Sequence, residues 1–220
     1  MTAESHNTGG TLTLTSEGQV QAKPDMATIN LGVVTEAKTA QEAVAQNAEL
    51  MTQVLNKIKA LGIPAEDLQT AGFNISPVVD YQEDSPTFGK IVSYRVEDTL
   101  RVKVPVALAG KVLDEGIGAG ANVAGQLSFG LRDETAFRHR ALEAAVKGAY
   151  CDAEFLAHAM GVTLQSPTSV ELLYGGSVVI ERSLMAAAKT ATPIEPGSLT
   201  ISASVRMVFK YDKPRGKSKR

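Results

Sequence analysis

Alternating apolar and polar positions, the period of a half-buried β-strand, recur along most of this chain. The runs with this period cover residues 11–22, 29–33, 73–81, 94–104, 123–129, 169–174 and 199–211. The first two runs are separated by a short break at Pro24 and Asp25, and they predict two strands that meet at a turn. The runs between 73 and 104 predict a long hairpin. The last run has one apolar and one polar face, which is typical of an antiparallel sheet with one side in water.

Helical periodicity predicts a long first helix after the second strand. Thr39 followed by Glu42 predicts its start, because each side chain can bond a free backbone amide of the first turn. Gly62 and Pro64 predict its end. Asn47 interrupts the apolar stripe, and we interpret it as a buried amide that bonds backbone rather than as a ligand contact.

Two further helices and the strand pattern together predict the fold class. A short helix covers about 108–117, and a long, alanine-rich helix covers about 134–160. The strand runs alternate, and helices and strands are neither strictly interleaved nor separated, so we predict an α+β fold with helices packed on antiparallel sheets. The predicted N-terminal subdomain covers residues 11–106 and is closed by the last strand, 198–211. A second α+β subdomain covers 107–175, a long loop covers 176–197, and the disordered ends are 1–10 and 212–220.

A series of single residues stands in a fixed order along residues 11–211, at the predicted strand ends, helix caps and turns. Its members are Pro24, Asp25, Thr39, Asn47, Gly62, Gly120, Asn122, Pro193, Glu195, Pro196 and Gly197. In this order they resemble the SIMPL-domain family, and the resemblance covers nearly the whole chain.

The resemblance implies a cellular setting. Bacterial members of that family are mostly exported, periplasmic or outer-membrane-associated proteins of uncertain activity, linked to oxidative-stress defence and known as immunogenic surface antigens. Some look like large channel-shaped homo-oligomers, so the implied partner is a second copy of the chain, with envelope proteins or the membrane surface as further partners. Residues 1–10 lack the charged and apolar regions of a signal peptide, so we expect either a removed leader or a cytoplasmic protein, and the family pattern favours export.

Composition and charge limit the kinds of partner that the chain can bind. The formal net charge is -2, from 22 basic and 24 acidic residues spread along the chain, which argues against a nucleic-acid surface. No run approaches the roughly 20 apolar residues that span a bilayer. Five basic residues close the chain, and we interpret them as a solvated end rather than a lipid or nucleic-acid site: Lys213, Arg215, Lys217, Lys219 and Arg220.

The glycines before residue 126 superficially resemble a dinucleotide-binding loop. That fingerprint requires a strand before the glycines and a helix after them, and here the predicted order is helix, glycines, strand. The sequence instead predicts a tight helix-to-strand connection with Asn122 bonding the turn. No cofactor is expected.

Residues that could carry metal or redox chemistry lie on the long helix. Cys151 and His158 are about 10 Å apart along the helix axis. Zinc ligands each lie about 2 Å from the metal, so we predict no metal site and a solvated His158. Cys151, the single cysteine, is interpreted as a small buried hydrophobe. The alternative is a redox-sensing thiol, although the chain has no second cysteine to resolve a sulfenic acid.

The function classes follow from these observations. The chain has no Gly-x-Ser-x-Gly elbow, and we predict no catalytic residues and no enzyme activity. The leading hypothesis is an exported, homo-oligomeric, envelope-associated scaffold linked to stress protection. One alternative is an adaptor that presents the loop at 175–197 to a protein partner. Another is a thiol-dependent antioxidant that acts through Cys151.

Overall fold

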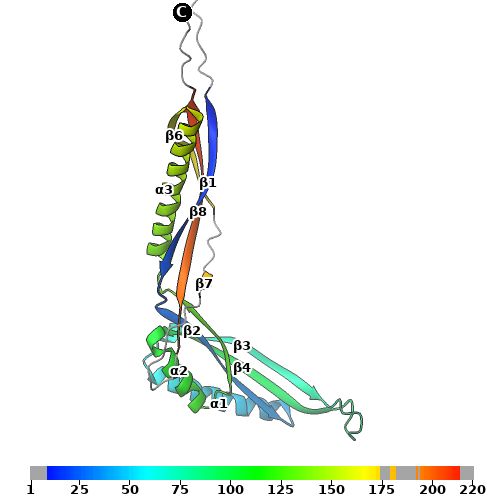
Figure 1. The fold of residues 1–220 in the computed structure, drawn as a ribbon. Coiled ribbons are helices and arrows are strands. Elements are labelled where there is room, and N and C mark those ends of the chain that lie inside the picture. The colour runs from blue at the N-terminus through cyan, green and yellow to red at the C-terminus, as the bar shows by residue number, and fades with distance from the viewer. Residues whose placement is uncertain (1–8, 174–178, 182–191, 193, 214–220) are drawn as a thin grey trace, which may run out of the picture. The chain divides into compact units, whose positions relative to one another are not determined.

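A computed structural model describes residues 9–173, 179–181, 192 and 194–213. The chain forms two compact units, and each is a sheet with helical cover (Figure 1). Unit 1 takes residues Met1–Lys23, Asp133–Glu181 and Ser198–Arg220, and unit 2 takes Pro24–Arg132 and Arg182–Gly197. The described elements comprise helices and antiparallel strands, which confirms the predicted α+β class.

Unit 2 is built on a sheet in the order β3-β4-β2-β5, in which every neighbouring pair is antiparallel. Its strands are β2 (Met26–Ala37), β3 (Leu68–Val79), β4 (Ile91–Pro105) and β5 (Val123–Gly130). Two helices, α1 (Ala40–Ala60) and α2 (Val106–Gly118), pack against β2 and β4, and a short 3-10 turn, η1 (Ala65–Asp67), precedes β3. Apolar residues of the strands and helices form the core between them, and the largest include Ile29, Leu31, Val54, Ile58, Val102 and Val112.

Both predicted ends of α1 are confirmed. The Thr39 hydroxyl accepts the Glu42 backbone N–H at 3.2 Å, which satisfies one free amide of the first turn. At the other end Gly62 has φ 80°, a left-handed conformation that glycine adopts without a Cβ penalty.

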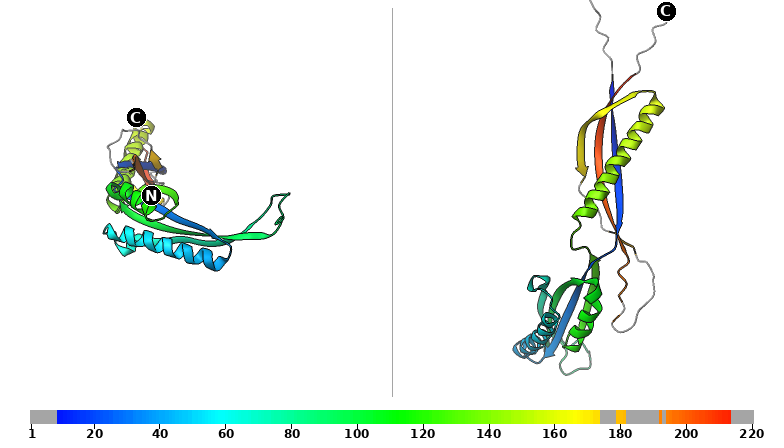
Figure 2. Two further views of the ribbon diagram at one scale, coloured as in Figure 1. Left: turned by 90° about the horizontal axis from the view of Figure 1, so that it is seen from below. Right: turned by 90° about the vertical axis from the view of Figure 1, so that its left-hand side faces the viewer.

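Unit 1 is a second antiparallel sheet, in the order β1-β8-β6, with the short strand β7 (Val179–Glu181) also paired to β8. β1 (Gly10–Ala22) and β8 (Ser198–Asp212) are in register from Gly10↔Tyr211 to Ala22↔Leu199. β6 (Thr163–Leu173) pairs along the other side of β8. The helix α3 (Thr135–Met160) packs on β1 and β8, as Figure 2 shows.

Alanines let α3 lie close to this sheet. Every fourth residue on its buried face is alanine: Ala141, Ala145, Ala149, Ala153 and Ala157. The approach is tightest at Gly18 of β1, where a Cβ would lie 2.1 Å from the carbonyl oxygen of Ala141. Gly18 is therefore required by the contact between strand and helix.

The predicted strands are present, but some have other partners than the sequence indicated. The hairpin between 73 and 104 is confirmed as β3 and β4. β1 and β2 do not form a pair, because they belong to different sheets. The last strand pairs with β1 and β6 and does not close the sheet of β2, β3 and β4.

The two units also divide the chain at other places than the predicted subdomains. The predicted second subdomain, 107–175, is split: α2 and β5 belong to unit 2, whereas α3 and β6 belong to unit 1. Strand periodicity identifies a strand but not its neighbour, so this division could not be read from the pattern. The predicted disordered ends lie outside the described residues except at 9–10 and 212–213, where the prediction was wrong: Gly10 begins β1 and Asp212 ends β8. Of the predicted loop at 176–197, the structure describes 179–181, 192 and 194–197.

Candidate functional site

The motif residues Pro24 and Asp25 have a structural role at the start of β2. An Asp25 carboxylate oxygen accepts the backbone N–H of Arg132 at 2.8 Å. The backbone N–H of Asp25 donates to Gly130, and its carbonyl accepts the N–H of Val106. Asp25 thus fastens the beginning of β2 to the end of β5 and to the first residue of α2.

Asn122 has a related role at the start of β5. Its side-chain oxygen accepts the Val34 N–H at 2.8 Å, and its side-chain nitrogen donates to the Val34 carbonyl at 2.7 Å. The sequence predicted that the Asn122 side chain would bond its own turn, and this was wrong. The side-chain amide instead bonds the backbone of Val34 in β2, as the backbone of a neighbouring strand would. Gly120, just before it, has φ 117° and permits the turn.

Asn47 is the buried amide that the sequence predicted, with 1% of its surface exposed. Its Nδ2 donates to the Val33 carbonyl at 2.8 Å and more weakly to the Val96 carbonyl at 3.4 Å. Asn47 therefore joins α1 to two adjacent strands, and its role is structural.

The motif before the last strand is partly described. Pro193 lies outside the described residues, Glu195 is exposed and Pro196 is half-buried. Gly197 has φ 66°, directly before β8. Nearby, Ile194 packs against the core of unit 2 and the Thr192 hydroxyl donates to Asp114 of α2 at 2.7 Å. This end of the segment 175–197 is held against its own unit.

The helical cysteine and histidines do not form a site in the described part of the chain. Cys151 is exposed, so its assignment as a buried hydrophobe was wrong. It lies two residues from the buried Ala149 and Ala153, and two residues correspond to about 200° around a helix. His158 is exposed, as predicted. No three His, Cys, Asp or Glu side chains among the described residues are close enough to hold a metal.

The most unusual surface of unit 2 is the hairpin of β3 and β4. β2 ends opposite Tyr94 of β4, so residues 78–93 continue without β2 beside them. Figure 2 shows the hairpin extending past the first turn of α1. Large apolar side chains, each 41–77% exposed, lie along it and in its connecting loop: Phe73, Ile75, Tyr81, Phe88, Ile91 and Val92. Exposed apolar side chains gathered on one segment are typical of binding surfaces, which makes the hairpin the candidate site of unit 2.

The loop that ends this hairpin, residues 80–90, is called the hairpin tip. Asp80 organises it: its carboxylate accepts the hydroxyls of Ser85 and Thr87 and the backbone N–H of Gln82 at 2.9 Å. These hydrogen bonds hold the pKa of Asp80 below its ordinary value of 3.8, and the bond from the Ser85 hydroxyl has the largest effect. The tip contains two further acids, Glu83 and Asp84, and a single lysine, Lys90. It is an ordered, acidic loop that presents two aromatic rings.

A cleft of about 300 Å³ lies at the opposite end of the same sheet. It is lined by residues from the start of β2, the end of β4, the end of β5 and η1: Met26, Thr28, Asp67, Lys103, Ser128, Phe129, Gly130, Leu131 and Arg132. Arg132 and Asp67 are loosely paired across it, with 3.9 Å between Nη2 and Oδ2. Among the ion pairs of the described residues none involves Lys103.

Sequence reasoning missed both surfaces. It predicted the hairpin but no surface on it, although Phe88 in the connecting loop and Tyr81 beside that loop were a visible signal. The cleft had no local signal, because its lining comes from four separate segments.

Comparison with known proteins gives the family. Residues 12–209 match the model of the SIMPL family, described as a protein of unknown function (DUF541). The 26 kDa periplasmic immunogenic protein of Brucella melitensis is 36% identical over 208 residues, which cover 90% of this chain and 83% of that protein. The uncharacterized protein YggE of Edwardsiella ictaluri is 30% identical over 152 residues, which cover 69% of this chain and 63% of that protein. YggE of Escherichia coli K12 is 30% identical over 142 residues, or 63% of this chain and 56% of that protein.

The family match and the first relative both extend over nearly the whole chain, so they include both units and the motif residues from Pro24 to Gly197. The chain belongs to the SIMPL family.

Proposed function

We propose that this chain is a non-enzymatic, exported protein that assembles with copies of itself into an envelope-associated scaffold linked to stress protection. The observation that carries the proposal is the hairpin of β3 and β4, with its exposed apolar side chains. Export is supported by the Brucella relative, which is named as periplasmic. None of the helices within the described ranges is long and apolar enough to cross a membrane.

A second copy is the favoured occupant of the hairpin for two reasons. β3 is an edge strand of 12 residues, and a long open edge is a template for pairing with another chain. The side chains around it are apolar, and burial of apolar surface stabilises a contact by about 25 cal/mol for each Å² removed from water. Most soluble oligomers are homo-oligomers, which favours another copy of the chain as the partner.

Self-assembly is tested by the size of the full chain in solution. We expect light scattering at micromolar concentration to report an oligomer, and the variant Ile75→Ser/Ile91→Ser to shift the population toward the monomer. The matched control is Val170→Ser, which removes an exposed apolar side chain from β6 of the other unit. A monomeric wild-type protein, or an oligomer that the hairpin variant leaves intact, contradicts the proposal.

The stress link is tested separately in cells. A strain that lacks the gene should survive peroxide less well than its parent, and expression of the wild-type chain should restore survival. Expression of Ile75→Ser/Ile91→Ser should restore it poorly if assembly carries the protection. Equal survival of the deletion strain and its parent would remove this part of the proposal and leave assembly untouched.

A further inference from the structure

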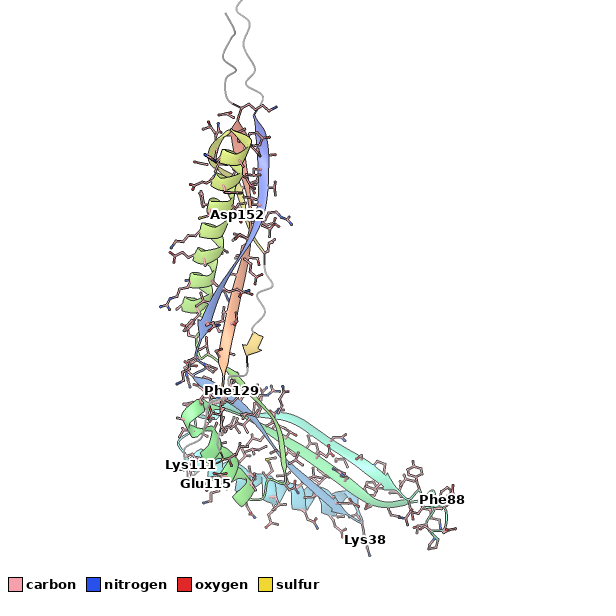
Figure 3. The ribbon with its side chains drawn as sticks, in the orientation of Figure 1. Lys38, Phe88, Lys111, Glu115, Phe129 and Asp152 are labelled. Carbon is pink, nitrogen blue, oxygen red and sulfur yellow. The ribbon has the colours of Figure 1, made fainter. Side chains whose placement is uncertain are left out.

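The hairpin tip and the cleft lie at opposite ends of one hairpin. Asp67, at the cleft, directly precedes β3, and Lys103 lies near the end of β4. Twelve residues of β3 at about 3.3 Å each separate them from the tip by about 40 Å. Figure 3 labels Phe88 at the far end of the hairpin and Phe129 by the other end of the sheet. A paired hairpin cannot fold back over this length, so the tip cannot occupy the cleft of its own chain.

The two surfaces have complementary chemistry. The tip presents the rings of Tyr81 and Phe88 together with the carboxylates of Glu83 and Asp84. The cleft offers apolar contacts from Met26 and Leu131 beside the cations Lys103 and Arg132, of which Asp67 offsets one. Specific protein interfaces commonly combine an aromatic anchor on one partner with opposite charges on the two partners around it.

The size of the cleft also favours a side chain as its occupant. Pockets for small molecules and cofactors range from about 300 to 1,000 Å³. At about 300 Å³ this cleft is at the lower end of that range. It accommodates one aromatic side chain better than a nucleotide-sized ligand. Asp25, through its bond to the N–H of Arg132, holds one wall of the cleft in place before anything binds.

We infer that the hairpin tip of one copy binds in the cleft of a second copy, with a ring of the tip against Met26 and Leu131 and with Glu83 and Asp84 facing Lys103 and Arg132. The inference rests on the proposed self-assembly and adds a second contact between copies, distinct from pairing along the edge of β3. Each copy contributes one tip and one cleft, so the contact is head-to-tail. Such contacts close into a ring or extend into a filament, according to the rotation between copies.

Charge reversal tests this contact in the full chain. Lys103→Glu places a carboxylate at the cleft, and Glu83→Lys/Asp84→Lys makes the tip basic; we expect each variant to weaken self-association about tenfold or more, measured by analytical ultracentrifugation. Combining all three substitutions in one chain re-creates opposite charges at every tip-to-cleft contact and should restore most of the association. The control is Lys111→Glu, an exposed lysine of α2 outside the cleft, which should leave association unchanged. Circular dichroism verifies that each variant is folded.

The outcomes separate this inference from the proposed function. If the wild type assembles and Ile75→Ser/Ile91→Ser dissociates it while both charge-reversed chains assemble normally, the head-to-tail contact is wrong and self-assembly stands. Failure of the combined variant to recover association also contradicts the contact. A wild type that is monomeric at every accessible concentration removes both proposals.

Discussion

The carboxylate of Asp25 accepts the backbone N–H of Arg132 at 2.8 Å, although 107 residues separate the two in the chain. The same residue bonds Gly130 and Val106 through its backbone. Three segments of unit 2 therefore meet at one residue. Arg132 is also the last residue of unit 2 before α3, so the bond holds the point where the chain leaves this unit.

Replacement of this carboxylate should cost stability without changing the fold. Asp25→Ala leaves the Arg132 N–H without its acceptor, and we expect a loss of about 1 kcal/mol in the free energy of unfolding. Asp25→Asn keeps an acceptor oxygen in the same position and should retain more of the stability. Urea denaturation of both variants measures the difference. Equal unfolding of Asp25→Ala and the wild type would show that the bond has no net value.

Gly18 gives a steric prediction in unit 1. A Cβ at this position lies 2.1 Å from the Ala141 carbonyl oxygen and 2.4 Å from the Ala145 nitrogen, so α3 must move away from β1 to admit it. We expect Gly18→Ala to lower the free energy of unfolding by about 1–3 kcal/mol, the range for overpacked contacts. The control is Gly72→Ala in β3, where an added Cβ meets nothing within 4 Å. The prediction fails if the two variants have the same thermal midpoint.

Asn47 is predicted to be hard to replace because it is buried and bonds two strands. Asn47→Ala leaves the carbonyls of Val33 and Val96 without this donor, and unpaired buried groups cost about 1–3 kcal/mol. Asn56, on the exposed side of α1, is the control, since Asn56→Ala only improves helix propensity. Thermal unfolding followed by circular dichroism compares them. A midpoint for Asn47→Ala at or above that of Asn56→Ala contradicts the structural role.

Local features of the fold were predictable because their causes lie within a few residues. Thr39 with Glu42 and Gly62 fix the ends of α1, and those signals involve neighbouring side chains and one backbone conformation. Asn47 was predictable as well, since a polar residue in an apolar stripe requires a buried partner.

Features that depend on distant segments were not predictable. The alternation of the last strand identified its buried face but could not show that β1 and β6 are its neighbours. The sequence predicted the alanine-rich helix α3 but not which of its residues face the sheet: Phe155 is 73% exposed, because alanines occupy the buried face. Close packing here selects the small apolar side chains over the large ones.

The same limit explains the candidate surfaces. The cleft is formed by four segments, and no periodicity shows that Asp67 and Arg132 face each other. The hairpin tip differs, because Tyr81 and Phe88 stand next to or inside an acidic loop and were visible as a pair of aromatic residues. Only the structure showed that both residues are more than half exposed.

The hairpin tip should loosen in acid. Hydrogen bonds from Ser85, Thr87 and Gln82 hold the pKa of Asp80 below 3.8, so its ionised form is favoured in the ordered loop. A depressed folded pKa contributes order that is present above pH 3.8 and is lost as the pH falls through the lower folded value. Amide exchange at Gln82, followed by NMR, should therefore accelerate below about pH 4 relative to amides of β4. Asp80→Asn removes the titrating group and should abolish this pH dependence while keeping an oxygen that accepts from Gln82. Acceleration that is the same in the wild type and in Asp80→Asn would contradict the role of Asp80.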